Sequence, residues 1–253
     1  MSIFQNDWLT WLLLPLSGNA NHELSFWASW HGRIMVLCWG VLLPLGVLAA
    51  RFFKVLPSQN WPETLDNKAW WKVHLHGQSA AIVLAAVGVA LIWNTAGGAT
   101  PLARWHGYMG WAVMALGVLQ AAAGFVRGSK GGPLEPLVQG DHYDMTPRRS
   151  RFEWTHKTLG YAALALALST VFMGLVVADA PRWMLLAVSL WYLVLATGFV
   201  WLQKQGRCID TYQAIWGPEA AHPGNRIAPI GWGIRRYSAA SFAKKFRKMK
   251  ETT

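Results

Sequence analysis

Five long apolar segments, separated by shorter polar connections, dominate the pattern of the chain. They run approximately over residues 27–53, 70–94, 102–126, 152–178 and 183–203, and charged residues lie almost only at their ends. A soluble helix would show a polar stripe along its length, whereas about 20 apolar residues suffice to cross a bilayer. Trp and Tyr gather at the segment ends, as at membrane interfaces. The pattern predicts an all-α membrane protein with five transmembrane helices.

A shorter apolar stretch, residues 8–16, precedes the first span. It is too short to cross the bilayer, and it is a poor match to a signal peptide because no Lys or Arg precedes it. We interpret it as an interfacial helix or a partner-docking segment. The expected organisation is an N-terminal periplasmic or interfacial segment (1–26), a four-helix core (27–178), an accessory fifth helix (179–203) and a basic cytoplasmic tail (204–253).

The composition agrees with this interpretation, and the distribution of charge orients the chain. Hydrophobic residues make up 53% and charged residues 14%, with a formal net charge of +11. Such a basic chain could bind nucleic acid, but only three of the 23 Lys and Arg, at positions 33, 104 and 182, fall on one side of the predicted topology. The positive-inside rule then places the N-terminus outside and the C-terminus in the cytoplasm. We expect a bacterial inner membrane protein and no nucleic-acid partner.

Histidines lie near the N-terminal ends of the first four spans, at positions 31, 74, 76, 106 and 156. An ionisable residue at membrane depth is a candidate functional residue, although a single one could equally be a neutral packing residue. Because consecutive spans alternate in direction, His31 and His106 are expected together near the outer face. His156 should meet His74 or His76 near the inner face. Paired imidazoles on facing helices are suited to hold haem iron.

Only one of His74 and His76 can face a partner, since two residues turn a helix by about 200°. We favour His76, which lies one turn deeper than Lys72. The expected metal ligands are therefore His31 with His106 and His76 with His156.

Small residues follow the histidines along two of the spans. Gly110 and Gly160 each lie four residues after a histidine, on the same helix face, and could let a flat macrocycle approach the backbone. Ordinary packing of small residues between membrane helices is the alternative. Three cations near the span ends, Arg33, Arg104 and Lys72, are candidates to bind haem propionates, or are snorkelling anchors.

The segment His-Gly-Arg-Ile-Met at 31–35, followed by Trp-Gly-Val-Leu-Leu-Pro-Leu-Gly at 39–46, resembles the first core helix of eukaryotic-type cytochrome b561 proteins, particularly those attached to DOMON domains. The segments around residues 76, 106 and 156 resemble the next three core helices in order, so the likeness covers roughly residues 30–174. It implies that the first and third core helices hold one b haem and the second and fourth another. The family moves electrons across membranes, often from ascorbate. This chain is expected to be a stand-alone core, with five spans in place of the usual six.

We therefore expect two non-covalent, bis-histidine b haems that carry single electrons across the membrane, with no acid–base catalytic residues. Whether the protein is itself an oxidoreductase enzyme is left open, as are its donor and acceptor. One alternative is a quinone-linked oxidoreductase, or a cytochrome subunit of a larger complex that exchanges electrons with quinone or a periplasmic cytochrome. A second is a haem-free accessory subunit whose histidines only pack.

Overall fold

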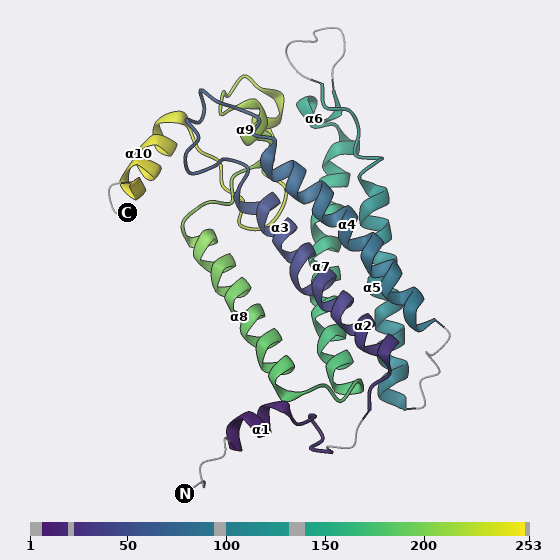
Figure 1. Ribbon diagram of the computed structural model, residues 1–253. Coiled ribbons are helices and arrows are strands. Elements are labelled where there is room, and N and C mark those ends of the chain that lie inside the picture. Colours follow the sequence, from purple (N-terminus) through teal and green to yellow (C-terminus); the bar gives the residue numbers. More distant parts are fainter. Residues whose placement is uncertain (1–6, 20–22, 94–99, 132–139, 251–253) are drawn as a thin grey trace, which may run out of the picture. The chain divides into compact units, whose positions relative to one another are not determined.

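The computed structural model describes residues 7–19, 23–93, 100–131 and 140–250. Helices account for nearly all regular structure in these ranges (Figure 1). In chain order they are α1 (Asp7–Leu13), α2 (Phe26–Met35), the π-helix η1 (Val36–Leu42), α3 (Leu43–Phe52), α4 (Ala69–Ile92), α5 (Pro101–Ala123), α6 (Asp141–Asp144), α7 (Pro147–Val177), α8 (Arg182–Lys204), α9 (Thr211–Trp216), the 3-10 helix η2 (Pro223–Arg226) and α10 (Ala239–Lys250). The predicted all-α class is confirmed.

Four stretches of helix within the described residues are long and apolar enough to cross a membrane: Phe26–Phe52, Ala69–Ile92, Pro147–Val177 and Arg182–Lys204. They correspond to the first, second, fourth and fifth predicted spans. The helix α5 has a similar length of 23 residues but is not among the four, because residues such as His106, Tyr108 and Gln120 dilute its apolar character. The third of the five spans therefore stays a prediction.

The chain divides into two compact units, and most long helices contribute residues to both. The first unit comprises residues 1–44, 78–118 and 162–198, and the second comprises 45–77, 119–161 and 199–253. The buried core of the first unit combines side chains from η1, α4, α5 and α7, together with the first residue of α3: Cys38, Trp39, Leu43, Ala81, Ala85, Val113, Met114, Ala167 and Val171. Small residues among them allow the helix backbones to approach closely.

Pro44 explains the irregular helix in the first unit. A proline removes one backbone donor and displaces the carbonyl four residues earlier, here that of Gly40. The helix widens to a π-helix over Val36–Leu42 just before this proline, as is common where the regular ladder is broken. The Gly40 carbonyl instead accepts a hydrogen bond from Nε1 of Trp191 at 2.8 Å. The neighbouring helix α8 thus satisfies the acceptor that the proline frees.

The N-terminal apolar stretch forms the short helix α1, which lies beside the start of α8 (Figure 1). Pro15 and Pro181 form an isolated β-bridge, and the Arg182 guanidinium lies 4.9 Å from the ring centroid of Trp11. Trp8 and Leu13 remain more than 60% exposed. The segment is therefore attached to the chain that joins α7 to α8, while its apolar side chains face outward.

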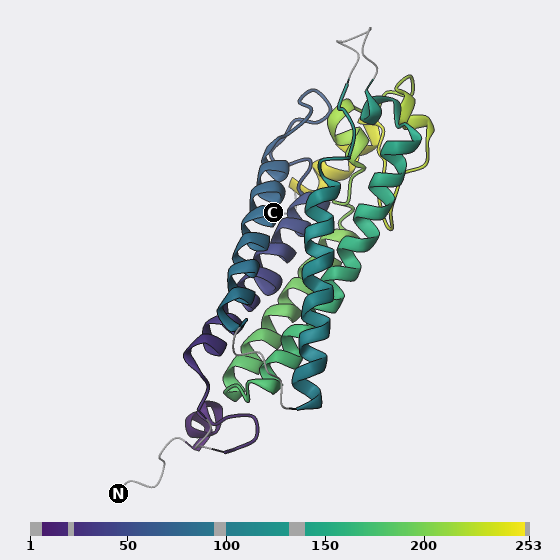
Figure 2. The ribbon, with the colours of Figure 1, turned by 90° about the vertical axis from the view of Figure 1, so that its right-hand side faces the viewer.

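The basic tail is folded within the second unit. Its residues pack with the connection after α3 in a second core of Val55, Trp61, Ile209, Ala214 and Phe242. Figure 2 shows α6 beside the yellow-green segment that contains α9, and the Tyr212 hydroxyl donates to the Tyr143 carbonyl at 2.7 Å. The Lys54 ammonium donates to the Ile209 carbonyl at 2.8 Å. The Arg207 guanidinium donates to the Val55 carbonyl at 2.7 Å.

Candidate functional site

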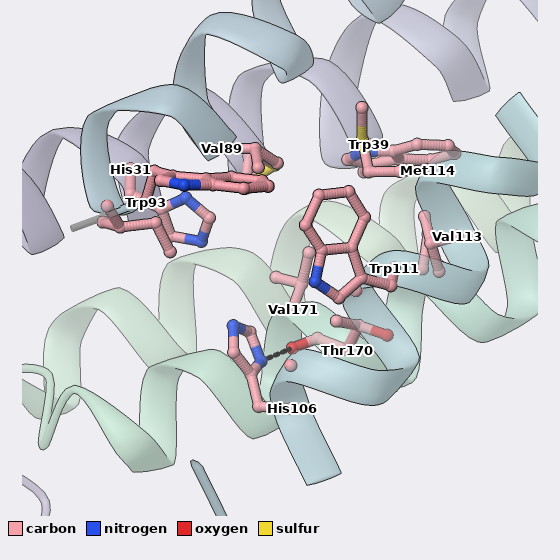
Figure 3. Close-up of a pocket in the computed structure, with 15 residues that line it drawn as sticks. His31, Trp39, Val89, Trp93, His106, Trp111, Val113, Met114, Thr170 and Val171 are labelled. Atoms are coloured by element: carbon pink, nitrogen blue, oxygen red, sulfur yellow. Dashed lines mark hydrogen bonds between the residues drawn. The ribbon is translucent and has the colours of Figure 1, made fainter. Parts of the chain in front are cut away.

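His31 on α2 and His106 on α5 face one another in the first unit, and we call them the first pair. Their ring centroids lie 6.2 Å apart, with the planes at 85°. Figure 3 shows the two imidazoles turned toward each other at one end of a cavity. The predicted meeting of these two residues is therefore seen in the structure.

Hydrogen bonds fix the orientation of both rings. Nδ1 of His31 lies 2.9 Å from the carbonyl oxygen of Gly88, and Nδ1 of His106 lies 3.2 Å from that of Thr170 (dashed in Figure 3). A carbonyl only accepts, so each Nδ1 carries the proton and donates. Each Nε2 then keeps its lone pair, which is the form of imidazole that binds a metal.

The first pair lines a mostly apolar cavity of about 280 Å³. Its wall includes Met35, Trp39, Trp111 and the backbone of Gly110. A Cβ atom built on Gly110 would meet no atom within 4 Å, so this glycine opens onto free space. At Gly174, in contrast, an added Cβ would lie 2.8 Å from Cε1 of His106. That glycine lets the imidazole reach the backbone of α7.

A second pair forms in the second unit, from His74 on α4 and His156 on α7. Their ring centroids lie 6.1 Å apart with the planes at 81°, nearly repeating the first pair. Nδ1 of His74 lies 3.2 Å from the carbonyl oxygen of Gly46. His76 is exposed, because two residues place it about 200° around the helix from His74. The expectation that His76 faces His156 is therefore corrected to His74.

The surroundings of His156 differ from those of the other three rings. Phe152, one turn earlier on α7, stacks on the imidazole with centroids 5.2 Å apart and an interplanar angle of 24°. The terminal amide of Gln120 reaches Nδ1 at 2.6 Å. Gly160, four residues on, opens onto space in which a Cβ would meet no atom within 4 Å. Both glycines singled out in the sequence thus border open space in their own units.

The three predicted propionate partners, Arg33, Arg104 and Lys72, are exposed. The Arg33 guanidinium lies over the ring of Trp30 at 5.3 Å. Exposed cations near helix ends fit both propionate binding and snorkelling, so their role stays a prediction.

Sequence reasoning missed several buried charged groups in the second unit, Arg51 and Glu153 among them. Arg51, 7% exposed, donates to the hydroxyl of Tyr161 and to Oε1 of Gln203 at 2.7 and 2.9 Å. Glu153, 5% exposed, contacts Arg149 and Lys157 at 3.1 and 2.7 Å. The i,i+4 spacing around Glu153 is visible in the sequence, but its burial is not.

The ring spacing suits a metal ion held between the members of each pair. Imidazole nitrogens bind metal ions at about 2 Å and lie about 1 Å from their ring centres, so two imidazoles that hold one metal ion between them would have centroids roughly 6 Å apart. The measured 6.2 and 6.1 Å match this value. The first pair combines two neutral nitrogen donors with an apolar cavity and a glycine that opens onto free space, a lining that fits a b-type haem.

The sequence profile of eukaryotic cytochrome b561 matches residues 30–180. The chain belongs to the eukaryotic cytochrome b561 family. It is 33% identical over 170 residues to human ferric-chelate reductase 1, and this alignment covers 67% of the chain and 25% of that protein. The mouse protein of the same name is 34% identical over 145 residues, covering 57% and 22% of the two chains.

A cytochrome b561 and DOMON domain-containing protein of Arabidopsis thaliana is 28% identical over 152 residues, covering 57% of this chain and 31% of its own. The chain thus spans about a quarter of the length of the first of these relatives. No solved structure matches it. Cytochromes b561 bind haem b, and membership together with the apolar helices identifies this chain as a multi-pass membrane protein.

Proposed function

We propose that this cytochrome b561 binds two haem b groups and carries single electrons across the membrane. His31 and His106 would hold one haem, and His74 and His156 the other. The observation that carries the proposal is the repetition of one geometry. Each pair has nearly perpendicular rings about 6 Å apart, and three of the four rings donate from Nδ1 to a backbone carbonyl.

The protein's own residues would bind the haems, orient the imidazole rings and shield the first site from water. The backbone carbonyls of Gly88, Gly46 and Thr170 hold the rings in the tautomer that leaves Nε2 free. The apolar wall of the first cavity, with Trp39 and Met114, excludes water. These imidazoles would hold haem iron, which would supply one-electron chemistry.

We further propose that the electron acceptor lies at the outer face and is a one-electron oxidant such as a ferric chelate. The relatives named ferric-chelate reductase support this substrate class. Alternation of the spans and the charge distribution support a bacterial inner membrane location, with the first pair toward the periplasm. A quinone or a periplasmic cytochrome is the other class of partner that the membrane location allows.

A pyridine haemochrome assay on the purified protein tests the cofactor content. We expect two haems b per chain. His31→Ala and His106→Ala should abolish the same spectral component, and His74→Ala and His156→Ala should abolish the other. A haem-free protein, a single haem, or loss of different components within one pair would refute the proposal.

Liposomes test the direction and the partners. The purified protein is reconstituted into liposomes that enclose a reductant, which reduces the haems from the lumen. Ferric citrate, a quinone or oxidised cytochrome c is then added outside. Rapid reoxidation by ferric citrate alone supports the proposed acceptor. Reoxidation by the quinone or by cytochrome c alone would contradict it.

A further inference from the structure

Arg127 places a partly buried guanidinium beside the second histidine pair. It follows α5 in the chain, and its Cζ lies 4.4 Å from the ring centroid of Trp71 on α4. The ring of Trp71 in turn lies 6.2 Å from that of His74. All three residues belong to the second unit and are partly buried. Trp71 therefore contacts both groups and links a positive charge to one of the two imidazoles.

An arginine on α7 repeats this arrangement at the other imidazole. Phe152 stacks on His156, and the Cζ of Arg149 lies 5.2 Å from the ring centroid of Phe152. Burial and the nearby charge of Arg149 both lower the pKa of Arg127, so the two guanidinium groups act on one another. Each imidazole of the second pair thus has an aromatic ring and an arginine beside it.

The two arginines differ in their carboxylate partners. Arg149 donates from Nε and Nη2 to Oε1 of Glu153, both at 3.1 Å. Arg127 forms no ion pair with any Asp or Glu in the part of the chain that the structure describes. A charge that is partly withdrawn from water and lacks a partner is costly. An anion bound at Arg127 would offset this cost.

The backbone on both sides of Arg127 is held in place. The carbonyl of the preceding residue accepts a hydrogen bond from Nε of Arg148 at 3.1 Å, and the N–H of Ser129 donates to Oδ2 of Asp141 at 3.0 Å. Between them, Gly128 has a φ of +85°, and a Cβ there would lie 2.6 Å from Oδ2 of Asp141. Only glycine allows this backbone and this close approach. The position of Arg127 is therefore built into the fold.

We propose that Arg127 binds a propionate carboxylate of the haem held by His74 and His156. This inference rests on the proposed function. A haem b carries two carboxylates at one edge of its ring, and a guanidinium is suited to bind a carboxylate through two parallel hydrogen bonds. Arg127 supplies a cation that no described carboxylate of the protein neutralises, and its contact with Trp71 holds the guanidinium beside the pair.

The dimethyl ester of haem b, which has no free carboxylate, isolates this contact. The full chain, produced without haem and purified in detergent, is titrated with ferric haem b or with its dimethyl ester. The spectral component that is absent from His74→Ala reports the second site. In the wild type, haem b should bind this site at least tenfold more tightly than the ester.

Two substitutions of Arg127 test the contact. Arg127→Gln should weaken the binding of haem b at the second site about tenfold and leave the binding of the ester unchanged. Arg127→Lys keeps the charge but loses the planar fork of the guanidinium, so its affinity for haem b should lie between those of the wild type and Arg127→Gln.

Arg151 provides a matched control. It is an exposed arginine on α7 that donates from Nε to the Pro147 carbonyl of its own helix at 3.3 Å. Arg151→Gln makes the same change of charge and side-chain type. The preference for haem b over the ester should keep its wild-type value at both sites in this variant.

A loss of this preference confined to the second site of Arg127→Gln supports the proposal. Equal weakening of haem b and the ester would show that Arg127 only stabilises the fold around the site, and would overturn it. Unchanged binding of haem b, with slower haem reduction by ascorbate, would assign Arg127 to an anionic electron donor and would also overturn it.

Retention of the first haem shows that a variant is folded. Should Arg127→Gln not retain it, Arg127→Lys carries the same comparison of haem b with the ester. If the wild-type chain binds fewer than two haems, it is the proposed function that fails.

Discussion

His74 and His76 show how a single residue of the site escapes sequence reasoning. The sequence correctly places a histidine of this segment near His156, since the order and direction of the spans decide that. Which of the two faces inward depends on the rotation of α4 about its axis, and this rotation is fixed by contacts such as the one between His74 and the Gly46 carbonyl. The apolar pattern of α4 is nearly uniform around the helix, so it gives no indication of the inward face.

The correction makes a sharp prediction for two neighbouring residues. His74→Ala should remove one of the two haems, because it deletes an imidazole that faces His156. His76→Ala changes an exposed side chain and should leave two haems per chain. Haem-to-protein ratios of the purified variants are the measurement, and the reverse result would restore the original assignment of His76.

Gly110 tests whether the cavity of the first pair is a haem site. Gly110→Val would project a side chain into space that is now open and that borders the cavity, so we expect at least a tenfold loss of haem in the first site. Gly198 on α8 also has no atom within 4 Å of a built Cβ but does not line the cavity. Gly198→Val should retain both haems, and equal haem loss in the two variants would indicate a general effect of valine in these helices.

At the level of elements, the long apolar runs predict the spans well because membrane helices must satisfy every backbone group internally. The boundaries agree within two or three residues except at one helix. The helix α7 begins at Pro147, five residues before the predicted start at 152. Proline favours the first turn, and pairs such as Arg149 with Glu153 stabilise helix outside the apolar run. A hydropathy pattern does not report such polar turns.

The π-helix η1 in the first span depends on a hydrogen bond from the neighbouring helix α8. Trp191→Phe should leave the Gly40 carbonyl without the hydrogen bond that replaces the one lost at Pro44. We expect a loss of about 1 kcal/mol in the free energy of unfolding, measured by denaturant titration in detergent. Trp183→Phe alters an exposed tryptophan at the start of α8 and should change stability much less. Equal losses would show that the π-helix needs no support from α8.

At the level of the whole molecule, the sequence predicts the order of the long apolar helices but not the folded tail. The tail reads as a basic, polar segment, yet Arg207, Ile209 and Asp210 are each 5% exposed or less. Arg207 and Ile209 contact residues more than a hundred positions away, Val55 and Lys54, and Asp210 pairs with Arg236. Long-range packing of short elements leaves no periodic trace in a sequence, and so the fold of the tail could not be predicted.

The second unit should be sensitive to acid through His142. Burial, reinforced by the nearby charge of Arg149 and opposed by Glu153, lowers the pKa of His142 to about 3. In the unfolded chain this imidazole has a pKa of about 6.5, so the unfolded state binds more protons between pH 6.5 and 3. The stabilising contribution is thus complete above pH 6.5 and is lost as the pH falls.

His142→Phe keeps a ring against Tyr212 and cannot titrate, so its melting temperature in detergent should fall less between pH 7 and 5 than that of the wild type. His76→Phe, which replaces an exposed imidazole, controls for the substitution itself. An unchanged dependence on pH in His142→Phe would contradict the prediction.

The charge asymmetry makes a prediction about the orientation of the entire chain. Twenty of the 23 Lys and Arg lie on the side assigned to the cytoplasm. Some of them, such as Arg51 and Lys54, are buried in the folded unit. The newly made chain nevertheless presents all of them to the membrane, and so they act on its orientation. Both native cysteines are buried, so cysteines introduced at exposed positions report accessibility. In right-side-out bacterial spheroplasts, Asn19→Cys should react with a membrane-impermeant thiol reagent. Ala240→Cys should react only after permeabilisation, and the opposite pattern would invert the topology and place the first histidine pair toward the cytoplasm.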